Sequence, residues 1–556
     1  MSVVTAEVQA PEQRKTIRQP GPFSSRAVLT IEKGARSLCR VLNQKAIWFL
    51  AAISVVYFCA GVALAYSKLL WFDELCTYSI ATLPNAAAIW SKLQSGTGPM
   101  PPSFYLLTKL SASLPGPIHV TIRLPELIGF LVASLCVFHF VRRSTSALYG
   151  FIAMLTVWIT GAYPFAYEAR PYGLVLGFGG IALVCWQSAT EQKKRLVPLV
   201  CLFFSCAGAV ASHYGALMLV FPLAVGEFVR SIVRKKLDWP IWLAMCGSGL
   251  PLLIFRPLLR ASISPYGMAM WSRPQLTSLL ECYSALLGMT AHPLAAVLVV
   301  LATWRVARAR AVITHILIRT AAISVWEVAA SVALLLLPAV GLLQAILVTN
   351  QITPRYVLPL VMGFGILAAL LAYENLRGDA VAGLLTVAVL LAGWASHVRW
   401  EYMTIRADVE RVQSLYLAVA LQPGNLPVAI NDGNRFFQLV HYAPQQLSSR
   451  LFYPVDSEAA IRFARTDSVD LCLLRYSSFL DFNVTPLNSF IEGRRPFLLY
   501  GSSGGWLLPD LQTKGHRAEL LNTPGLHSLY LISPNPAVTP VSDHLNLEAV
   551  SAVSRD

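Results

Sequence analysis

Two adjacent carboxylates, Asp73 and Glu74, stand in the stretch WFDELCTY at residues 71–78. They follow a run of apolar residues that ends near Tyr66, in a chain with few charges. A carboxylate beside a membrane surface can take a proton from an acceptor group, which is general base chemistry. The structural alternative is that Asp73 caps the N-terminus of a short helix, ELCTYSIAT. The choice between these roles depends on where the two residues lie relative to the membrane.

The composition predicts a polytopic membrane protein. Hydrophobic residues make up 55% of the 556 residues and charged residues only 13%, which is about half the charged fraction of an average soluble domain. The net charge of +15 could indicate a nucleic-acid partner, but the basic residues lie mostly in short segments between apolar runs. The ten cysteines include no CxxC pair and lie mostly inside the apolar runs, so they predict neither a disulfide framework nor a zinc site.

About eleven segments are candidates for membrane-spanning helices, of which 290–304 is the weakest. They lie near 46–66, 123–141, 147–165, 171–189, 196–212, 214–230, 239–255, 290–304, 326–348, 355–373 and 380–396. A stretch at 310–325 could add a re-entrant piece or shift the count by one.

Basic residues alternate between the predicted loops, and Lys and Arg favour the cytoplasmic side. They are concentrated in the N-terminal tail, residues 1–45, and in every second loop, for example at Arg142, Lys193, Arg230, Arg305 and Arg377. The tail is too long and too mixed for a cleaved signal peptide. The tail and these loops are therefore predicted to be cytoplasmic, whereas the long loop 67–122 and everything after residue 397 lie outside.

The outward loops hold few charged residues, and these are the candidates for binding. Glu168 and Arg170 lie in AYPFAYEARPYGL, His213 lies in SHYGAL, and Arg355 and Tyr356 lie in TNQITPRYVLPL. The structural alternatives are a local ion pair for Glu168, a hydrogen-bonding role for His213 and snorkelling for the arginines. Arginines in outward loops are exceptions to the preference of basic residues for the cytoplasmic side. Their planar guanidinium groups are suited to bind a phosphate, so these residues favour an anionic lipid as ligand.

Six stretches taken together resemble the GT-C superfamily of membrane glycosyltransferases, which includes protein O-mannosyltransferases and the aminoarabinose transferases that modify lipid A. They are WFDE, PPSFYLLTKL, RLPELIGFL, YEARPYGL, SHYGAL and PRYVLPL, all predicted on one side of the membrane, within residues 46–400. The resemblance implies a polyprenyl-phosphate sugar donor, Asp73 as catalytic base with Glu74 in the same motif, and Arg170 near the donor phosphate. Relatives often have His or Lys where this chain has Met100, so another cation must substitute or the donor is held differently.

Residues 400–556 are predicted to form an α/β domain with a mostly parallel sheet. Strands are expected at 427–432, 450–455, 470–475, 496–501, 516–521 and 528–533, with helices at NRFFQLVHYA and SEAAIRFAR. In the first loop, 84–94 and 102–114 are expected to be short helices along the interface.

The predicted fold is thus an α-helical polytopic membrane protein with a C-terminal soluble α/β domain, located in the cell inner membrane. Its parts are a basic tail at 1–45, a GT-C-like transmembrane domain at 46–399 and an extracytoplasmic domain at 400–556. The expected function is transfer of a sugar from polyprenyl phosphate to a lipid, glycan or protein acceptor, with inversion at the anomeric carbon. A single displacement needs a base to activate the acceptor and cations to stabilise the departing phosphate. Asp73 is the expected base. Glu74 is expected either to orient Asp73 or to hold the acceptor.

Two alternatives stay open at this point. One is a transporter or flippase of lipid-linked sugars, although neither mid-membrane charges nor two similar halves are visible. The other is a catalytically inactive sensor built on the same frame. No metal-binding cluster stands out, so no cofactor is assigned and a divalent cation remains an open alternative.

We predict that residue 20 is cytoplasmic and residue 450 is not. Alkaline phosphatase needs disulfides that form outside the cytoplasm, so its fusion after residue 400 is expected to be highly active in a bacterial host. Low activity there, together with high activity of a fusion after residue 236, would invert the predicted orientation.

Overall fold

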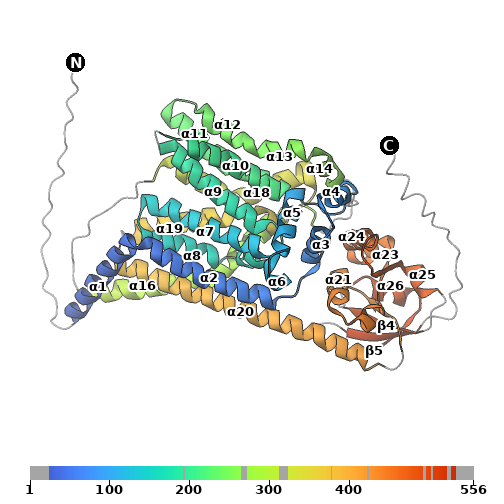
Figure 1. The fold of residues 1–556 in the computed structure, drawn as a ribbon. Helices are drawn as coiled ribbons and strands as arrows, with labels where there is room; N and C mark the ends of the chain where they lie inside the picture. Colours follow the sequence, from blue (N-terminus) through green and yellow to red (C-terminus); the bar gives the residue numbers. More distant parts are fainter. Residues whose placement is uncertain are drawn as a thin grey trace, which may run out of the picture.

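The structure is a computed structural model that describes residues 24–191, 194–263, 272–311, 323–376, 379–422, 425–492, 496–501, 505–522 and 528–533. A bundle of helices forms its larger part, and a smaller domain that contains a sheet lies beyond one end of the bundle (Figure 1). The predicted fold class, a helical membrane bundle with a C-terminal α/β domain, is confirmed.

The bundle helices overlap the predicted spans, except α15 (Thr277–Leu287), which lies before the span predicted at 290–304 and was not predicted. They are α2 (Ala46–Ser67), α7 (Leu124–Ser144), α8 (Ala147–Trp158), α9 (Tyr172–Glu191), α10 (Leu196–Ser212), α11 (Val220–Arg234), α12 (Trp239–Met245), α13 (Gly249–Ile254), α15 (Thr277–Leu287), α16 (Ala291–Ala311), α17 (Val325–Leu335), α18 (Leu337–Gln344), α19 (Leu360–Leu376) and α20 (Ala380–Ala420). Short helices connect them: η1 (Tyr163–Tyr167), η2 (Tyr214–Leu219), η3 (Cys246–Ser248), α14 (Arg256–Ile263), η4 (Gly288–Thr290), η5 (Ala345–Thr349) and η6 (Pro354–Val357).

The number of membrane crossings stays a prediction. In the part of the chain that the structure describes, six helices are long and apolar enough to cross a membrane, or seven if α17 and α18, bent by 51°, form one span with η5. The other four predicted spans fall on shorter apolar helices. Most of the re-entrant piece considered at 310–325 lies outside the described residues.

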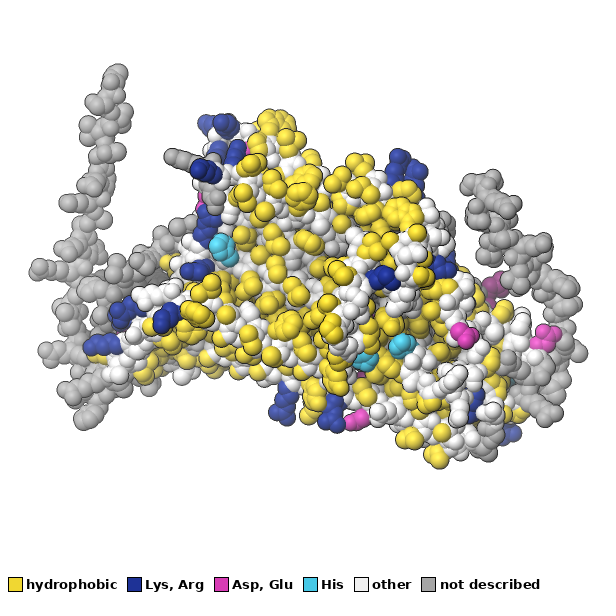
Figure 2. All heavy atoms as spheres, in the orientation of Figure 1, with side chains coloured by type: hydrophobic (Ala, Val, Ile, Leu, Met, Phe, Trp, Pro, Cys, Tyr) yellow, Lys and Arg dark blue, Asp and Glu magenta, His cyan; other side chains and the backbone are white. Residues whose placement is uncertain are grey.

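The outer surface of the bundle is apolar, as the yellow side chains in Figure 2 show. Large hydrophobic side chains are exposed on several helices, among them Trp48, Val55, Phe204 and Leu298. Such a surface is unfavourable in water but matches the hydrocarbon of a bilayer. Lys and Arg side chains gather along α1 (Ser24–Gln44), a helix within the predicted tail, and around the turn from α11 to α12, at the end of the bundle away from the sheet domain (Figures 1 and 2).

Helices α7 and α9 approach each other through glycines. A Cβ atom added at Gly129 would lie 2.5 Å from the carbonyl oxygen of Gly173, and one added at Gly173 would lie 2.4 Å from that of Glu126. Small residues of this kind let two helix backbones touch. The Glu126 carboxylate also accepts a hydrogen bond from the backbone N–H of Leu174 at 3.0 Å. The first turn of α9, just after Arg170, is therefore held firmly against the first turn of α7.

Four short helices fill the first loop between the bundle and the sheet domain (Figure 1). They are α3 (Phe72–Ala81), α4 (Ala86–Gln94), α5 (Pro102–Ala112) and α6 (Ile118–Thr121). The helices predicted at 84–94 and 102–114 are thus confirmed as α4 and α5. Asn85 caps α4 by accepting a hydrogen bond from Ala88 N, and α5 begins with Pro102, a residue suited to the first helical position.

The C-terminal domain contains a six-stranded sheet of order β3-β2-β1-β4-β6-β5. The strands are β1 (Val428–Ile430), β2 (Leu451–Val455), β3 (Asn483–Pro486), β4 (Phe497–Gly501), β5 (Arg517–Asn522) and β6 (Ser528–Ser533). The pairs β3–β2, β2–β1 and β1–β4 are parallel, whereas β6 is antiparallel to both β4 and β5. The helices are α21 (Gly433–Tyr442), α22 (Gln445–Ser448), α23 (Ser457–Ala464), α24 (Ser468–Ser477), α25 (Leu487–Ile491) and α26 (Leu507–Thr513). Helices α21 and α24 pack on the face turned toward α3, and α23, α25 and α26 cover the other face.

The strands of this domain differ from the expected ones at two places. The strand expected at 470–475 is wrong, because these residues belong to α24, where the buried Asp470, Leu473 and Tyr476 repeat at helical spacing. The edge strand β3 was not predicted, since it is short and ends in Pro486, which an edge strand tolerates. The boundary predicted at residue 400 falls inside α20, which runs unbroken from the bundle to the sheet domain (Figure 1).

Candidate active site

Asp73 lies in the first turn of α3 and faces two arginines from distant loops. Its Oδ2 atom is 2.7 Å from Arg355 Nη1 and 3.6 Å from Arg170 Nη2. The side chains of Asp73 and Arg355 are 19% and 20% exposed, whereas that of Arg170 is 5% exposed. The structure therefore brings together three predicted site residues, and their cluster is open on the side of Asp73 and Arg355.

The helix cap considered for Asp73 is not what the structure shows. Helix α3 begins at Phe72, so Asp73 is already a helical residue. The backbone N–H of Trp71, which precedes the helix, donates instead to Glu74 Oε2 at 3.3 Å. Because Glu74 satisfies this end of the helix, the Asp73 carboxylate is not needed for α3 to form.

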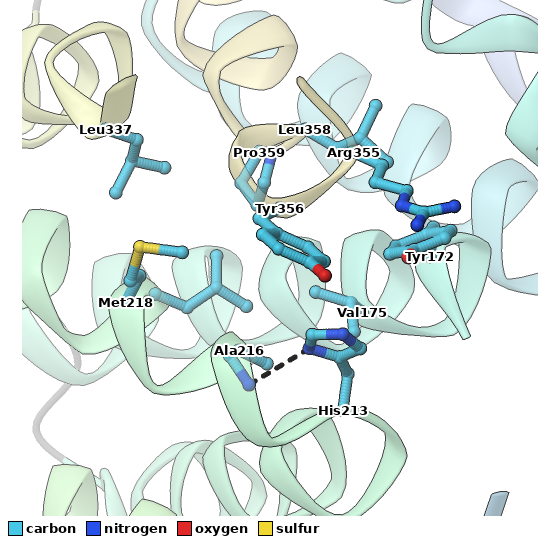
Figure 3. Close-up of a pocket in the computed structure, with 12 residues that line it drawn as sticks. Tyr172, Val175, His213, Ala216, Met218, Leu337, Arg355, Tyr356, Leu358 and Pro359 are labelled. Carbon is cyan, nitrogen blue, oxygen red and sulfur yellow. Dashed lines mark hydrogen bonds between the residues drawn. The ribbon is translucent and has the colours of Figure 1, made fainter. Parts of the chain in front are cut away.

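His213 and Tyr356, two further predicted residues, line a narrow cavity beside Arg355 (Figure 3). The His213 ring lies between two tyrosines, with centroids 5.7 Å from Tyr172 and 5.6 Å from Tyr356. The remaining walls are mostly apolar, with Val175, Met218, Leu219, Leu337, Leu358 and Pro359. The cavity thus has a charged end at Arg355 and a hydrophobic remainder.

The imidazole of His213 is neutral at physiological pH. Burial, together with the charges of Arg170 and Arg355, lowers the pKa of His213 to about 3. Its Nδ1 atom accepts a hydrogen bond from the backbone N–H of Gly215 at 3.0 Å. The ring proton therefore resides on Nε2, which makes His213 a hydrogen-bond donor rather than a cation.

Glu74 points away from Asp73 into the protein and forms a buried ion pair with Arg123. Its Oε1 and Oε2 accept from Arg123 Nε at 2.7 Å and Nη2 at 2.6 Å, and Oε1 also accepts from the backbone N–H of Ala169 at 2.7 Å. The Glu74 and Arg123 side chains are 0% and 1% exposed. Arg123 donates further bonds to the carbonyl oxygens of Ala65, Lys68 and Leu69 at the end of α2.

This pair keeps Glu74 ionised and out of reach of a ligand. Burial alone would raise the pKa of Glu74, but the charge and hydrogen bonds of Arg123 outweigh it and hold the pKa below its usual value. With both oxygens engaged inside the protein, Glu74 has no surface to offer an acceptor. Of the two roles expected for it, orienting Asp73 is the one that the geometry supports.

Glu168 lies outside the cluster around Asp73. Its carboxylate pairs with Lys68 Nζ at 2.6 Å rather than with Arg170, the partner that its sequence position suggested. Burial raises the pKa of Glu168 in spite of the neighbouring ammonium group. Met100 is also buried, in the apolar cluster around α3 and α5, so its position supplies no polar group to a ligand.

Sequence reasoning missed three residues: Arg123, Lys68 and Tyr172. Arg123 and Lys68 could have been found, because both are basic residues in or next to an outward loop and outward loops are poor in Lys and Arg. The same argument selected Arg170. Tyr172 carried no such signal, because an aromatic residue opening a span is typical of any interfacial anchor. Among the described residues, no group of three or more His, Cys, Asp or Glu side chains is placed to hold a metal ion.

The Glu74→Gln variant is expected to be destabilised by roughly 3–5 kcal/mol, because it leaves Arg123 as an unpaired buried charge. A thermal unfolding experiment in detergent measures this as a lower midpoint. Since the pKa of Glu74 is lowered on folding, the contribution is complete at neutral pH and is lost as the pH falls below about 4. Glu410→Gln is the matched control, because Glu410 pairs with Arg406 on the surface, with side chains 68% and 61% exposed. Equal midpoints for both variants and the parent protein would contradict the assignment.

No protein-family profile and no curated protein matches the chain significantly by sequence, but solved structures match it by fold. The crystal structure of ArnT from Cupriavidus metallidurans in the apo state has a TM-score of 0.54 at 13% identity, over 88% of this chain and 98% of that chain. The structure of ArnT from the same organism bound to undecaprenyl phosphate has a TM-score of 0.53 at 13% identity, over 89% of this chain and 99% of that chain. This chain therefore has the fold of ArnT.

Proposed function

We propose that this chain is a membrane glycosyltransferase that moves a sugar from a polyprenyl-phosphate donor to an acceptor on the extracytoplasmic face. The observation that carries the proposal is the contact of the Asp73 carboxylate with Arg170 and Arg355 beside an amphiphilic cavity. A base and two phosphate-binding groups are the elements that a single displacement from a phosphate requires. The fold of an ArnT bound to undecaprenyl phosphate gives further support.

The donor phosphate is assigned to the arginine pair. Two guanidinium groups can share the charge of the phosphate, which grows as the sugar departs, and their partial burial strengthens that interaction. The neutral His213 can donate its Nε2–H to a phosphate oxygen. The first isoprene units then lie along the apolar wall near Val175 and Leu337. In this arrangement Arg355 supplies the cation that Met100 does not.

Asp73 is assigned as the general base. Both arginines approach its Oδ2 atom, so Oδ1 is the oxygen that takes the proton from the acceptor. A bound phosphate competes with Asp73 for the arginines, and the loss of these contacts frees the carboxylate for the acceptor at the moment when the donor is in place. The acceptor attacks the anomeric carbon from the face opposite the phosphate, and the configuration inverts.

The remaining predicted residues are assigned supporting roles. Glu74 positions Asp73 through its ion pair with Arg123. Tyr356 shapes the cavity through its ring contact with His213. Glu168 and Lys68 form a second ion pair behind the Glu74–Arg123 pair, and we assign them to the positioning of this loop rather than to the phosphate.

A transfer assay tests the proposal against transport. The full chain in nanodiscs is incubated with polyprenyl-phosphate sugars labelled in the sugar, with cell-envelope fractions as acceptors. A glycosyltransferase releases unglycosylated polyprenyl phosphate and leaves the label on another molecule. The opposite outcome is that the label stays on the polyprenyl phosphate with every sugar, while the donor crosses vesicle membranes only when the protein is present. That outcome would replace the proposal by that of a flippase.

Asp73→Asn is expected to reduce turnover in this assay by at least about 100-fold, because Asn cannot accept the proton. The variant is expected to fold, since Glu74 and not Asp73 satisfies the start of α3. It should also bind donor, because both arginines remain. The matched control is Asp481→Asn, the same change at an exposed position of the C-terminal domain. Near-normal turnover of folded Asp73→Asn protein would remove Asp73 from the base role.

Arg170→Ala and Arg355→Ala are each expected to weaken the binding of polyprenyl phosphate by about 10- to 100-fold. The reason is the loss of a charge-assisted hydrogen bond, worth roughly 1.5–3 kcal/mol. Equilibrium binding in nanodiscs measures the effect, and Arg406→Ala, at a position on α20 that is 61% exposed, is the control. Unchanged affinity in both variants would show that the phosphate binds elsewhere.

A further inference from the structure

Two cysteines meet at the contact between α3 and the C-terminal domain. Cys76 lies on α3, three residues after Asp73, and Cys472 lies on α24. The other eight cysteines lie on α1 or on the apolar helices of the bundle: Cys39, Cys59, Cys136, Cys185, Cys201, Cys206, Cys246 and Cys282. The two cysteines that lie outside those helices are thus the two that face each other across a domain contact.

Three observations place the two thiols side by side. The hydroxyl of Tyr476, one turn after Cys472 on α24, donates a hydrogen bond to the carbonyl oxygen of Cys76 at 3.2 Å. The thiol of Cys472 is close enough to that of Cys76 to raise its pKa. Both are buried in the same apolar cluster, together with Phe437 and Leu473. A disulfide requires the two sulfur atoms to approach to about 2.05 Å, and this contact brings together the two elements that carry them.

The location of the pair distinguishes it from a second thiol pair in the same chain. Cys185 and Cys201 are also neighbours, but they lie on α9 and α10, inside apolar helices. Cys76 and Cys472 lie at the end of the bundle that carries the C-terminal domain, which the charge bias predicts to be extracytoplasmic. Disulfides form and persist in such compartments and not in the cytoplasm.

We propose that Cys76 and Cys472 form a disulfide that links α3 to the C-terminal domain. The oxidant is a disulfide, either of a small thiol or of a thiol oxidoreductase. The two thiols lose two protons and two electrons and gain one S–S bond, while the S–S bond of the oxidant is reduced to two thiols. The proposal rests on the predicted orientation and not on the proposed sugar transfer.

The bond is expected to form while the domain docks and not afterwards. Burial is the main cause that raises the pKa of Cys76 well above its usual value, and the neighbouring thiol of Cys472 raises it further. A buried thiol of this kind is rarely ionised, and only the thiolate attacks a disulfide. The exchange therefore takes place before α24 has closed over α3, and the finished bond is protected from reductants.

The disulfide would give the C-terminal domain a role at the active site. On the other side of Asp73, Gln438 donates to the carbonyl oxygen of Leu70 at 3.1 Å, and the backbone N–H of Leu70 donates to Tyr442 at 2.8 Å. The domain thus holds the chain three residues before Asp73 and three residues after it. A covalent link at Cys76 fixes the second of these contacts.

Counting reactive thiols tests the proposal. The full chain is purified from membranes of a host with an oxidising extracytoplasmic compartment, denatured and labelled with a maleimide. Of the ten cysteines, eight are expected to react before reduction and all ten after it, and a peptide pair joined through Cys76 and Cys472 is expected in the mass spectrum. The count does not depend on glycosyl transfer, so it separates a failure here from a failure of the proposed function.

Two variants sharpen the count. Cys472→Ser is expected to show nine reactive thiols with or without reduction, because its partner is released. Cys201→Ser, the matched change in the bundle pair, is expected to show seven before reduction and nine after it. Ten reactive thiols in the unreduced parent protein, or a linked pair that does not contain both Cys76 and Cys472, would overturn the proposal. If Cys472→Ser does not fold, the parent count and the linked peptide still decide.

Discussion

The buried ion pair of Glu74 with Arg123 is the interaction on which the site depends. Neither charge is stable inside the protein without the other, so the pair forces together the end of α2, the start of α3, the start of α7 and the segment before α9. Asp73 is the chain neighbour of Glu74, and Arg170 is the chain neighbour of Ala169, whose N–H binds Glu74. One buried contact therefore sets the distance between the proposed base and its arginine.

Two adjacent carboxylates have different chemistry here because their surroundings differ. Glu74 is fully buried and held by one arginine and two backbone N–H groups, which leaves it no freedom to react. Asp73 is partly exposed and is held through one oxygen by arginines that a phosphate can take over. Separation of roles by environment, with one group as support and the other as reactant, is a common arrangement in enzymes that use paired carboxylates.

The sequence was sufficient for the helical frame and for three residues of the site. Apolar length predicted the helices, and the alternation of basic residues placed Asp73, Arg170 and Arg355 on one side. Long-range partners could not be predicted: Arg123 opens a helix like an ordinary interfacial anchor, and Glu168 binds Lys68 although Arg170 is nearer in sequence. The error at 470–475 has a different cause, since six residues of mixed polarity fit both a strand and one and a half turns of a helix.

The position of a bound polyprenyl phosphate tests these assignments most directly. A cryo-EM structure of the full chain with polyprenyl phosphate in nanodiscs is expected to show the phosphate within hydrogen-bonding distance of Arg170 and Arg355. The lipid chain is expected along the cavity wall at Val175 and Leu337, with Asp73 released from Arg355. A phosphate bound at the opposite end of the bundle, near the turn from α11 to α12, with the Asp73–Arg355 contact intact, would contradict the proposed site.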